Sequence, residues 1–412
     1  MRRSGAPEQR SASDMSASQP APPAPAGQTR RLVLRLVSAQ VCIHACMTGF
    51  RMAAPLMALR EGFSPLAVGV LVALFALSQV FLSLPAGRFV DRYGLHRPMA
   101  VAVVISVAGG LMATIWPVFG VLCATALACG ASSGLALIAL QRTVGLLAQD
   151  ATELKQVFSW LALGPAVSNF VGPLLAGVLI DASGFRAAYA VLALLPLLAW
   201  WNVRRLVLPL HTRPTPVAEP ESSWTLLRQP RFARLLALNW VLASCWDVHT
   251  FLVPVLGHEQ GISATAIGSV LGVFAVAATV VRVLTSHLAA RLHEMKVVGG
   301  AMAVTALLFA VYPLLGSAWS MGLASVGLGF ALGSVQPMIM STLHQITPHH
   351  RHGEAVALRA MAINASSVLM PLLFGTVGAA VGVAWVFWTV AGVVGAGAPL
   401  TWRSRLHMPI SP

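Results

Sequence analysis

Long apolar segments, separated by short polar stretches, recur along the chain from residue 32 onward. Each is about 20 residues long, the length of helix that crosses a hydrocarbon core of about 30 Å. Lipid offers the backbone no hydrogen-bond partners, so each segment must satisfy its own backbone as a helix. The pattern predicts an all-α integral membrane protein with twelve transmembrane helices, at residues 32–58, 65–87, 98–117, 119–141, 157–180, 187–203, 232–256, 263–284, 297–315, 319–343, 355–380 and 383–401.

The polar segments divide these helices into two groups of six. The longest of them, residues 204–231, is expected to be a cytoplasmic linker between an N-terminal bundle, 32–203, and a C-terminal bundle, 232–401. Residues 1–31 are rich in Ser, Pro, Ala and Gln, which predicts a disordered cytoplasmic tail. This tail has no apolar core, so we do not expect it to be a cleaved signal peptide. Residues 402–412 are expected to be a second cytoplasmic tail.

The two halves of the chain share an internal repeat, because the same small residues return at a nearly constant spacing. Four residues return 199 positions later: Pro55, Gly62, Ser64 and Gly69 as Pro254, Gly261, Ser263 and Gly268. Three others return 198 positions later: Pro173, Gly177 and Gly184 as Pro371, Gly375 and Gly382. This agreement predicts two pseudo-symmetric six-helix bundles, and such parallel repeats build transporters whose site lies between the halves near the middle of the membrane.

Composition supports a membrane protein. Hydrophobic residues make up 57% of the chain and charged residues only 10%, whereas soluble proteins carry about 25% charged residues. A net charge of +14 would indicate nucleic-acid binding in a soluble protein. The predicted spans, however, place 24 of the 27 Lys and Arg residues on one side of the membrane. We therefore expect no nucleic-acid partner.

The same charge distribution predicts the orientation. Only Arg60 and Arg186 fall in loops on the other side, and Arg51 lies within a span. By the positive-inside rule, both termini are expected to be cytoplasmic. We expect a multi-pass protein of a bacterial inner membrane, monomeric and surrounded by lipid.

Neither an enzyme nor a bound cofactor is expected. All five cysteines lie in apolar segments, and no pair has the spacing of a zinc site. The chain has no phosphate-binding Walker pattern and no paired carboxylates in an aqueous setting. We therefore predict no metal, no cofactor and no catalytic residue.

A short basic loop bounded by glycines follows the second predicted span. Gly87 and Gly94 allow two helix ends to approach closely and turn sharply. Between them, Asp91 could accept hydrogen bonds from the N-terminus of a neighbouring helix, while Arg92 and Arg97 could pair with acids or lipid phosphates. A loop that only sets orientation would explain the arginines but not the acid.

This loop resembles the signature of the major facilitator superfamily, Gly-x-x-x-Asp-Arg-x-Gly followed by basic residues. Four residues match the pattern: Gly87, Asp91, Arg92 and Gly94. Leu95 and His96 depart from it, and Arg97 restores the basic character. The resemblance covers residues 32–401 and implies a transporter of twelve helices, in which the loop acts as a conformational latch. The second half has Ala290 where the acid would stand, so its latch is degenerate.

The fifth predicted span carries a second motif, Gly172 and Pro173 followed by Gly177. It is similar to the family's Gly-Pro-x-x-Gly-Gly, which is associated with proton-driven exporters, although Ala176 replaces one glycine. The similarity implies a drug or metabolite:proton antiporter. Close helix packing explains the same residues equally well. Many exporters of the family also carry an arginine four residues before the residue that matches Gly130; here that position is Ala126.

Polar residues within the spans are the candidate site, because a charge at membrane depth costs about 2.5–3.5 kcal/mol on insertion scales. In the first span, one helix face carries Gln40, His44, Thr48, Arg51 and Pro55. In the equivalent seventh span, one face carries Asn239, Asp247, Thr250 and Pro254. The family resemblance implies that the first and seventh helices line a central cavity, and we predict that these two faces, with Gln336 from the tenth span, do so. His249 lies about 200° around its helix from Asp247 and is expected to face elsewhere.

Arg51 and Asp247 are the only strongly charged residues that we place deep in the membrane, one in each half. Three hypotheses follow. In the first, Asp247 takes up a proton and drives the export of small amphipathic or hydrophobic compounds by alternating access. In the second, Arg51 is the counter-charge for the uptake of a small organic anion. In the third, the protein is a membrane receptor or assembly protein that has kept the fold without transport, although such a protein would have no need to bury the pair. A static ion pair that only sets packing remains the alternative for the pair itself.

Overall fold

The computed structural model describes residues 26–147, 151–206, 223–288, 293–348 and 351–403, and all of its regular elements are helical. The first half contains α1 (Ala26–Arg60), α2 (Pro65–Tyr93), α3 (His96–Ile115), α4 (Phe119–Leu147) and α5 (Ala151–Val203). The second half contains α6 (Pro230–Glu259), α7 (Ala264–Leu288), α8 (Glu294–Val311), α9 (Ala318–Ile346), α10 (His352–Val381) and α11 (Val383–Arg403). Short 3-10 helices lie at Ser223–Arg228 and Tyr312–Leu314.

These eleven helices contain the twelve predicted spans, because α5 holds two of them. The helix passes through Gly184, whose φ of 81° and ψ of 175° are not helical. Glycine adopts positive φ without a steric penalty, so the chain reverses there without the loop that the sequence predicted. Among the described residues, ten helices are long and apolar enough to cross a membrane. The two spans of α5 count as one of these ten, and α11 contains a shorter apolar segment.

The repeat found in the sequence is also present in the backbone. Gly62 and Gly261 have φ values of 82° and 68°, and Gly184 and Gly382 have φ values of 81° and 90°. The turns at Gly62 and Gly261 are followed by equivalent helix caps. The Ser64 side chain accepts a hydrogen bond from the backbone N–H of Ala67, and that of Ser263 from Ala266. Each half therefore follows the same path.

Two boundaries differ from the prediction. Helix α1 begins at Ala26, inside the segment 1–31 that we expected to be disordered. Its first turns carry Arg30 and Arg31. Hydropathy excludes these charged residues from a membrane span, but arginine has a high helix propensity, so the helix can include them. The predicted linker 204–231 contains the 3-10 helix Ser223–Arg228 and the start of α6. Residues 1–25, 207–222 and 404–412 lie outside the described residues.

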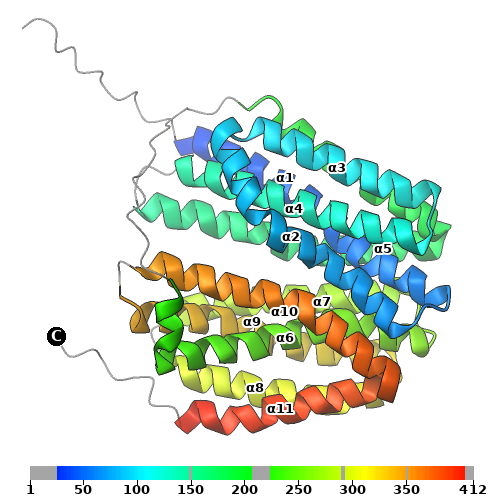
Figure 1. The fold of residues 1–412 in the computed structure, drawn as a ribbon, viewed down its shortest axis with the longest axis vertical. Helices are drawn as coiled ribbons and strands as arrows, with labels where there is room; N and C mark the ends of the chain where they lie inside the picture. The colour runs from blue at the N-terminus through cyan, green and yellow to red at the C-terminus, as the bar shows by residue number, and fades with distance from the viewer. Residues whose placement is uncertain (1–25, 148–150, 207–222, 289–292, 349–350, 404–412) are drawn as a thin grey trace, which may run out of the picture.

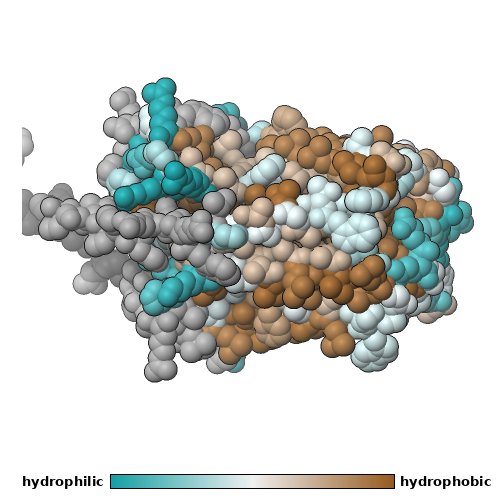
Figure 2. Space-filling view, turned by 90° about the horizontal axis from the view of Figure 1, so that it is seen from below, coloured by the Kyte–Doolittle hydropathy of each residue, from teal (hydrophilic) through white to brown (hydrophobic). Residues whose placement is uncertain are grey.

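The surface of the helices matches a hydrocarbon environment. Figure 2 shows hydrophobic residues along the middle of the face that it presents, with hydrophilic residues at its two ends. Large apolar side chains are exposed on this exterior, among them Phe81 and Leu323 at 72% and 73%. Such exposure would be costly in water and is favourable in lipid.

The helices form two six-helix bundles (Figure 1). The bundles meet through two equivalent pairs, α5 with α7 and α2 with α10. A Cβ atom at Gly268 would meet the Pro173 carbonyl, and one at the equivalent Gly69 would meet the Pro371 carbonyl. Both contacts involve the beginnings of α2 and α7, which lie on the side opposite the basic loops. Glycine permits this approach of two backbones.

Candidate functional site

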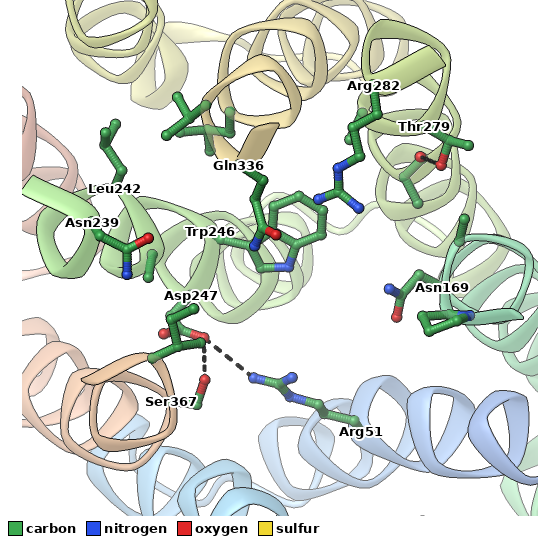
Figure 3. Close-up of a pocket in the computed structure, with 18 residues that line it drawn as sticks. Arg51, Asn169, Asn239, Leu242, Trp246, Asp247, Thr279, Arg282, Gln336 and Ser367 are labelled. Atoms are coloured by element: carbon green, nitrogen blue, oxygen red, sulfur yellow. Dashed lines mark hydrogen bonds and ion pairs between the residues drawn. The ribbon is translucent and has the colours of Figure 1, made fainter. Parts of the chain in front are cut away.

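A cavity of about 240 Å³ lies between the two bundles (Figure 3). Helices α1, α5, α6, α7, α9 and α10 form its walls. Its polar lining consists of Arg51, Asn169, Asn239, Trp246, Asp247, Thr279, Arg282, Gln336 and Ser367. Apolar side chains such as Leu242 and Val335 fill the spaces between them. This mixture of lining groups suits a small amphipathic molecule.

An ion pair crosses the cavity from one bundle to the other. Nη2 of Arg51 on α1 lies 3.6 Å from Oδ1 of Asp247 on α6. Asp247 is 3% exposed, and it accepts further hydrogen bonds from the hydroxyls of Ser366 at 2.9 Å and Ser367 at 3.3 Å. A buried carboxylate needs such partners to remain ionised. The Arg51 side chain keeps 26% of its surface exposed.

The position of Asp247 follows from the internal repeat. Its equivalent in the first half is Thr48, whose hydroxyl donates to the carbonyl of Ser168 at 2.9 Å. Ser168 is in turn the equivalent of Ser366, which donates to Asp247. The two halves thus hold the same helix pair together at the same place. The second half uses a carboxylate where the first half uses a hydroxyl.

Four of the six predicted site residues line this cavity: Arg51, Asn239, Asp247 and Gln336. Thr48 and Thr250 line a smaller neighbouring cavity of about 50 Å³, which shares Arg51. His249 faces away from the site, as the sequence predicted. Its Nε2 lies 2.8 Å from the Ser325 hydroxyl, and its ring stacks on Phe274 with the centroids 4.1 Å apart.

Gln40 and His44 lie elsewhere, contrary to the prediction. Nδ1 of His44 lies 3.1 Å from the Ser133 hydroxyl on α4. The Gln40 side chain packs against Gly164 on α5. At Arg51 this face of α1 points to the cavity. Two to three turns earlier, at His44 and Gln40, the same face is covered by α4 and α5 of its own bundle.

Two arginines that the sequence assigned to the basic side belong to the site instead. Arg282 on α7 lines the cavity, and its guanidinium lies over the Trp246 ring at 5.6 Å from the centroid. Arg359 on α10 is 9% exposed, and its Nε donates to Oδ1 of Asn239 at 3.1 Å. The expectation that Arg51 and Asp247 are the only deep charges is therefore wrong.

The basic loop makes different contacts from those expected. Asp91 accepts a hydrogen bond from Nε of Arg142 at 2.8 Å, within its own bundle, instead of from a helix N-terminus. Arg92 and Arg97 lie over the Tyr93 ring at 5.3 and 4.9 Å from the centroid. Gly94 ends α2 with a φ of 69°, and the Gly87 Cα faces open space. Ala290 lies outside the described residues.

A different acid holds a helix N-terminus across the bundles. Asp181 on α5 accepts hydrogen bonds from the backbone N–H groups of Ala264 at 3.1 Å and Thr265 at 2.7 Å. These residues begin α7, where the partial positive charge of the helix favours a carboxylate. The contact lies on the side opposite the basic loops and adds to the glycine contacts there. Sequence reasoning missed Asp181, which falls at the end of a predicted span.

The motif of the fifth span is a packing surface on two sides. Gly172 faces α1, where a Cβ atom would lie 2.7 Å from the Ala45 carbonyl. Pro173 and Gly177 face α7. The motif therefore joins α5 both to its own bundle and to the other one.

No group of three His, Cys, Asp or Glu side chains within the described parts of the chain could hold a metal ion. The described cysteines are all free thiols.

Known proteins resemble this chain in sequence and in fold. A family model described as Major Facilitator Superfamily matches residues 36–358 and 235–410. A relative from Salmonella typhimurium (strain LT2), "Multidrug resistance protein MdtG", is 25% identical over 254 residues. The match spans 59% of this chain and 62% of that protein, so less than two thirds of the relative is covered.

Two solved structures share the fold over most of the chain. The nucleoside transporter NupG superposes with a TM-score of 0.75 at 14% identity, covering 90% of this chain and 100% of that one. A bacterial homologue of the human lysosomal transporter Spinster, in an inward-facing and unoccupied conformation, gives a TM-score of 0.74 at 13% identity. That match covers 94% of this chain and 100% of the other. At these identities the likeness concerns the fold alone.

Proposed function

The chain belongs to the Major Facilitator Superfamily, and from this premise we propose that it is a secondary active transporter that exports small amphipathic or hydrophobic compounds in exchange for protons. The family and the fold are those of transporters and not of enzymes. Export is supported by the relative named as a multidrug resistance protein. It is also supported by the mixed polar and apolar lining of the cavity.

The observation that carries this proposal is the Arg51–Asp247 ion pair. It joins the two bundles through opposite charges, so a change of charge on either side chain would act on both bundles. A proton on Asp247 removes the charge that attracts Arg51, because only the ionised carboxylate forms an ion pair. The bundles then lose a link across the cavity, which favours their movement relative to each other. Alternating access in transporters of this kind is such a movement around a fixed site.

We infer that the side with the basic loops is cytoplasmic and that the membrane is the inner membrane of a bacterium. With this orientation both termini are cytoplasmic. The bundle contacts at Gly268, Gly69 and Asp181 then close the outer side of the cavity. We infer that this conformation faces inward and that a substrate would enter from the cytoplasm.

Asp247→Asn is expected to abolish proton-driven transport while leaving the protein folded, because the amide keeps the shape and the serine contacts but cannot exchange a proton. The measurement is flux into proteoliposomes with and without a pH gradient, using the compound that most stabilises the purified protein in a thermal-shift screen. Exchange of that compound at equal pH should persist. The matched control is Glu61→Gln, which neutralises an exposed acid in the loop before α2. Undiminished proton coupling in the Asp247 variant would contradict the proposal.

Uptake of a small organic anion is the second candidate. It is favoured by the partial exposure of the Arg51 side chain, 26%, beside a single acid at 3.6 Å. Arg51→Lys should then weaken the binding of a carboxylate, since lysine cannot form the two parallel hydrogen bonds of a guanidinium. An unchanged affinity in that variant would exclude this role for Arg51.

A further inference from the structure

Three buried hydrogen-bond donors around the cavity have no acceptor among the described residues. They are Nδ2 of Asn239, Nε of Arg282 and Nη2 of Arg359. The amide of Asn239 is oriented by its Oδ1, which accepts from Nε of Arg359, so the unpaired atom is the donating nitrogen. A buried donor without an acceptor costs about 1–3 kcal/mol, and more when it is charged. These three donors come from three different helices, α6, α7 and α10, and each lacks an acceptor within the described part of the chain.

The charges of the site show the same imbalance. Arg51 and Arg282 line the cavity, and Arg359 lies close enough to Arg282 for the two positive charges to repel each other. The single lining carboxylate, Asp247, already accepts from Arg51 and two serines. Guanidinium groups at membrane depth are normally paired. Arg282 has no described carboxylate within ion-pair distance.

The surroundings of Arg282 also indicate what kind of molecule would pair with it. Its guanidinium lies over the Trp246 ring, and both groups face the cavity (Figure 3). Leu242 and Val335 are apolar residues of the same lining. A ligand that places an anionic group at Arg282 would therefore lay its apolar body against Trp246.

We propose that Arg282 binds the carboxylate or sulfonate of an amphipathic organic anion in this cavity. A guanidinium presents a planar fork that matches two oxygens of such a group. This inference rests on the proposed function, because it names the substrate class of the same cavity. It does not depend on the direction of transport.

Three ligands of nearly equal shape test the proposal: benzoate, benzamide and benzamidine, which carry negative, zero and positive charge. Each is added at millimolar concentration to purified protein in a non-ionic detergent, and the shift in Tm and the Kd are measured. Benzoate should raise the Tm of the wild type, and the other two should not. If benzoate gives no shift, or benzamide gives an equal one, the proposal is overturned.

Substitutions identify the residue. Arg282→Gln should weaken benzoate binding about tenfold, equivalent to about 1.4 kcal/mol, and Arg282→Lys should retain part of the affinity. Arg186→Gln, at an exposed arginine outside the cavity, is the matched control and should bind normally. Without ligand, Arg282→Gln should have a Tm no lower than the wild type, because it removes an unpaired charge. Normal benzoate affinity in this folded variant would overturn the role of Arg282.

The test separates this inference from the proposed function. Selective binding of benzoate is measured at equilibrium and needs no proton gradient. If Asp247→Asn keeps proton coupling but Arg282→Gln loses benzoate, the coupling mechanism fails and the anion site stands. If Asp247→Asn loses proton coupling but Arg282→Gln binds benzoate normally, the coupling mechanism stands and the anion site is rejected.

Discussion

Asp247 and His249 lie two residues apart on α6 and face opposite sides of the helix. Asp247 reaches into the cavity and pairs with the other bundle. His249 is fully buried within its own bundle, against Phe274 and the hydroxyl of Ser325. That hydroxyl also lies 2.9 Å from the Tyr312 hydroxyl. His249 therefore contributes to the packing of α6 against α7 and α9, whereas Asp247 is the residue on which the proposed function depends.

His249→Ala should lower the stability of the protein by about 2–4 kcal/mol, because it leaves a cavity and removes a hydrogen bond. The thermal unfolding midpoint in detergent measures this change. His258→Ala, at a half-buried histidine near the end of the same helix, should have a much smaller effect. A normal midpoint in the His249 variant would mean that its contacts contribute little.

Residue patterns predicted part of the site. Helical spacing correctly brought Asn239 and Asp247 to the cavity and turned His249 away from it. It failed for Gln40 and His44, because angular position on a helix does not say which neighbour covers each turn. It also missed Arg282, since its place near the end of an apolar segment suggested a loop charge that orients the protein. Only tertiary packing shows that such a side chain turns inward.

At the scale of helices, the close contacts of α5 with α7 and of α2 with α10 depend on glycine. The repeat pairs Gly69 with Gly268 and Pro173 with Pro371, and each glycine meets the carbonyl of a proline from the other bundle. Two equivalent contacts therefore close the same side of the cavity. The sequence predicted this duplication but gave no sign of which helices of the two bundles meet.

Gly268→Ala should separate α5 from α7, because its methyl group would clash with the Pro173 carbonyl. The side opposite the basic loops should then open more often. A cysteine introduced by Thr250→Cys in a cysteine-free background should react severalfold faster with a membrane-impermeant thiol reagent from that side. Gly300→Ala is the control, since nothing lies within 4 Å of its new methyl group. Equal reaction rates in the two variants would contradict this role of Gly268.

Helix existence and order were predictable from hydropathy, because a span needs about 20 apolar residues. Helix ends were less predictable. Helix α1 extends back to Ala26 and the chain reverses at Gly184, and neither feature changes the hydropathy of a segment. Such features depend on how the helix continues beyond the lipid and on the φ values that glycine allows.

At the scale of the whole molecule, the proposed alternating-access mechanism requires the two bundles to take two arrangements around one cavity. The described arrangement is held on one side by Asp181, which accepts from the first N–H groups of α7. The repeat predicts the two bundles but is symmetric, so it could not say which side is closed. That information comes from contacts between residues more than 80 positions apart.

Asp181→Ala should shift the population towards the arrangement that is open on this side. Hydrogen bonds to a charged acceptor contribute about 1.5–3 kcal/mol each, so the loss of two corresponds to a shift of tenfold or more. Distances between spin labels on the loops that precede α2 and α7 would measure it. Glu61→Ala removes an exposed acid from the same side and should leave the distances unchanged. An unaltered distribution in the Asp181 variant would show that other contacts close this side.

The charges that line the cavity also determine how a membrane potential acts on the carrier. Among the lining residues Arg51 and Arg282 are positive and Asp247 is negative, and the buried Arg359 beside Asn239 adds a further positive charge, so the site carries an excess of two positive charges. Moving one elementary charge through 100 mV changes its energy by about 2.3 kcal/mol. An organic anion bound at Arg282 would halve this excess. The voltage would then act less strongly on the reorientation of the loaded carrier than on the return of the empty one.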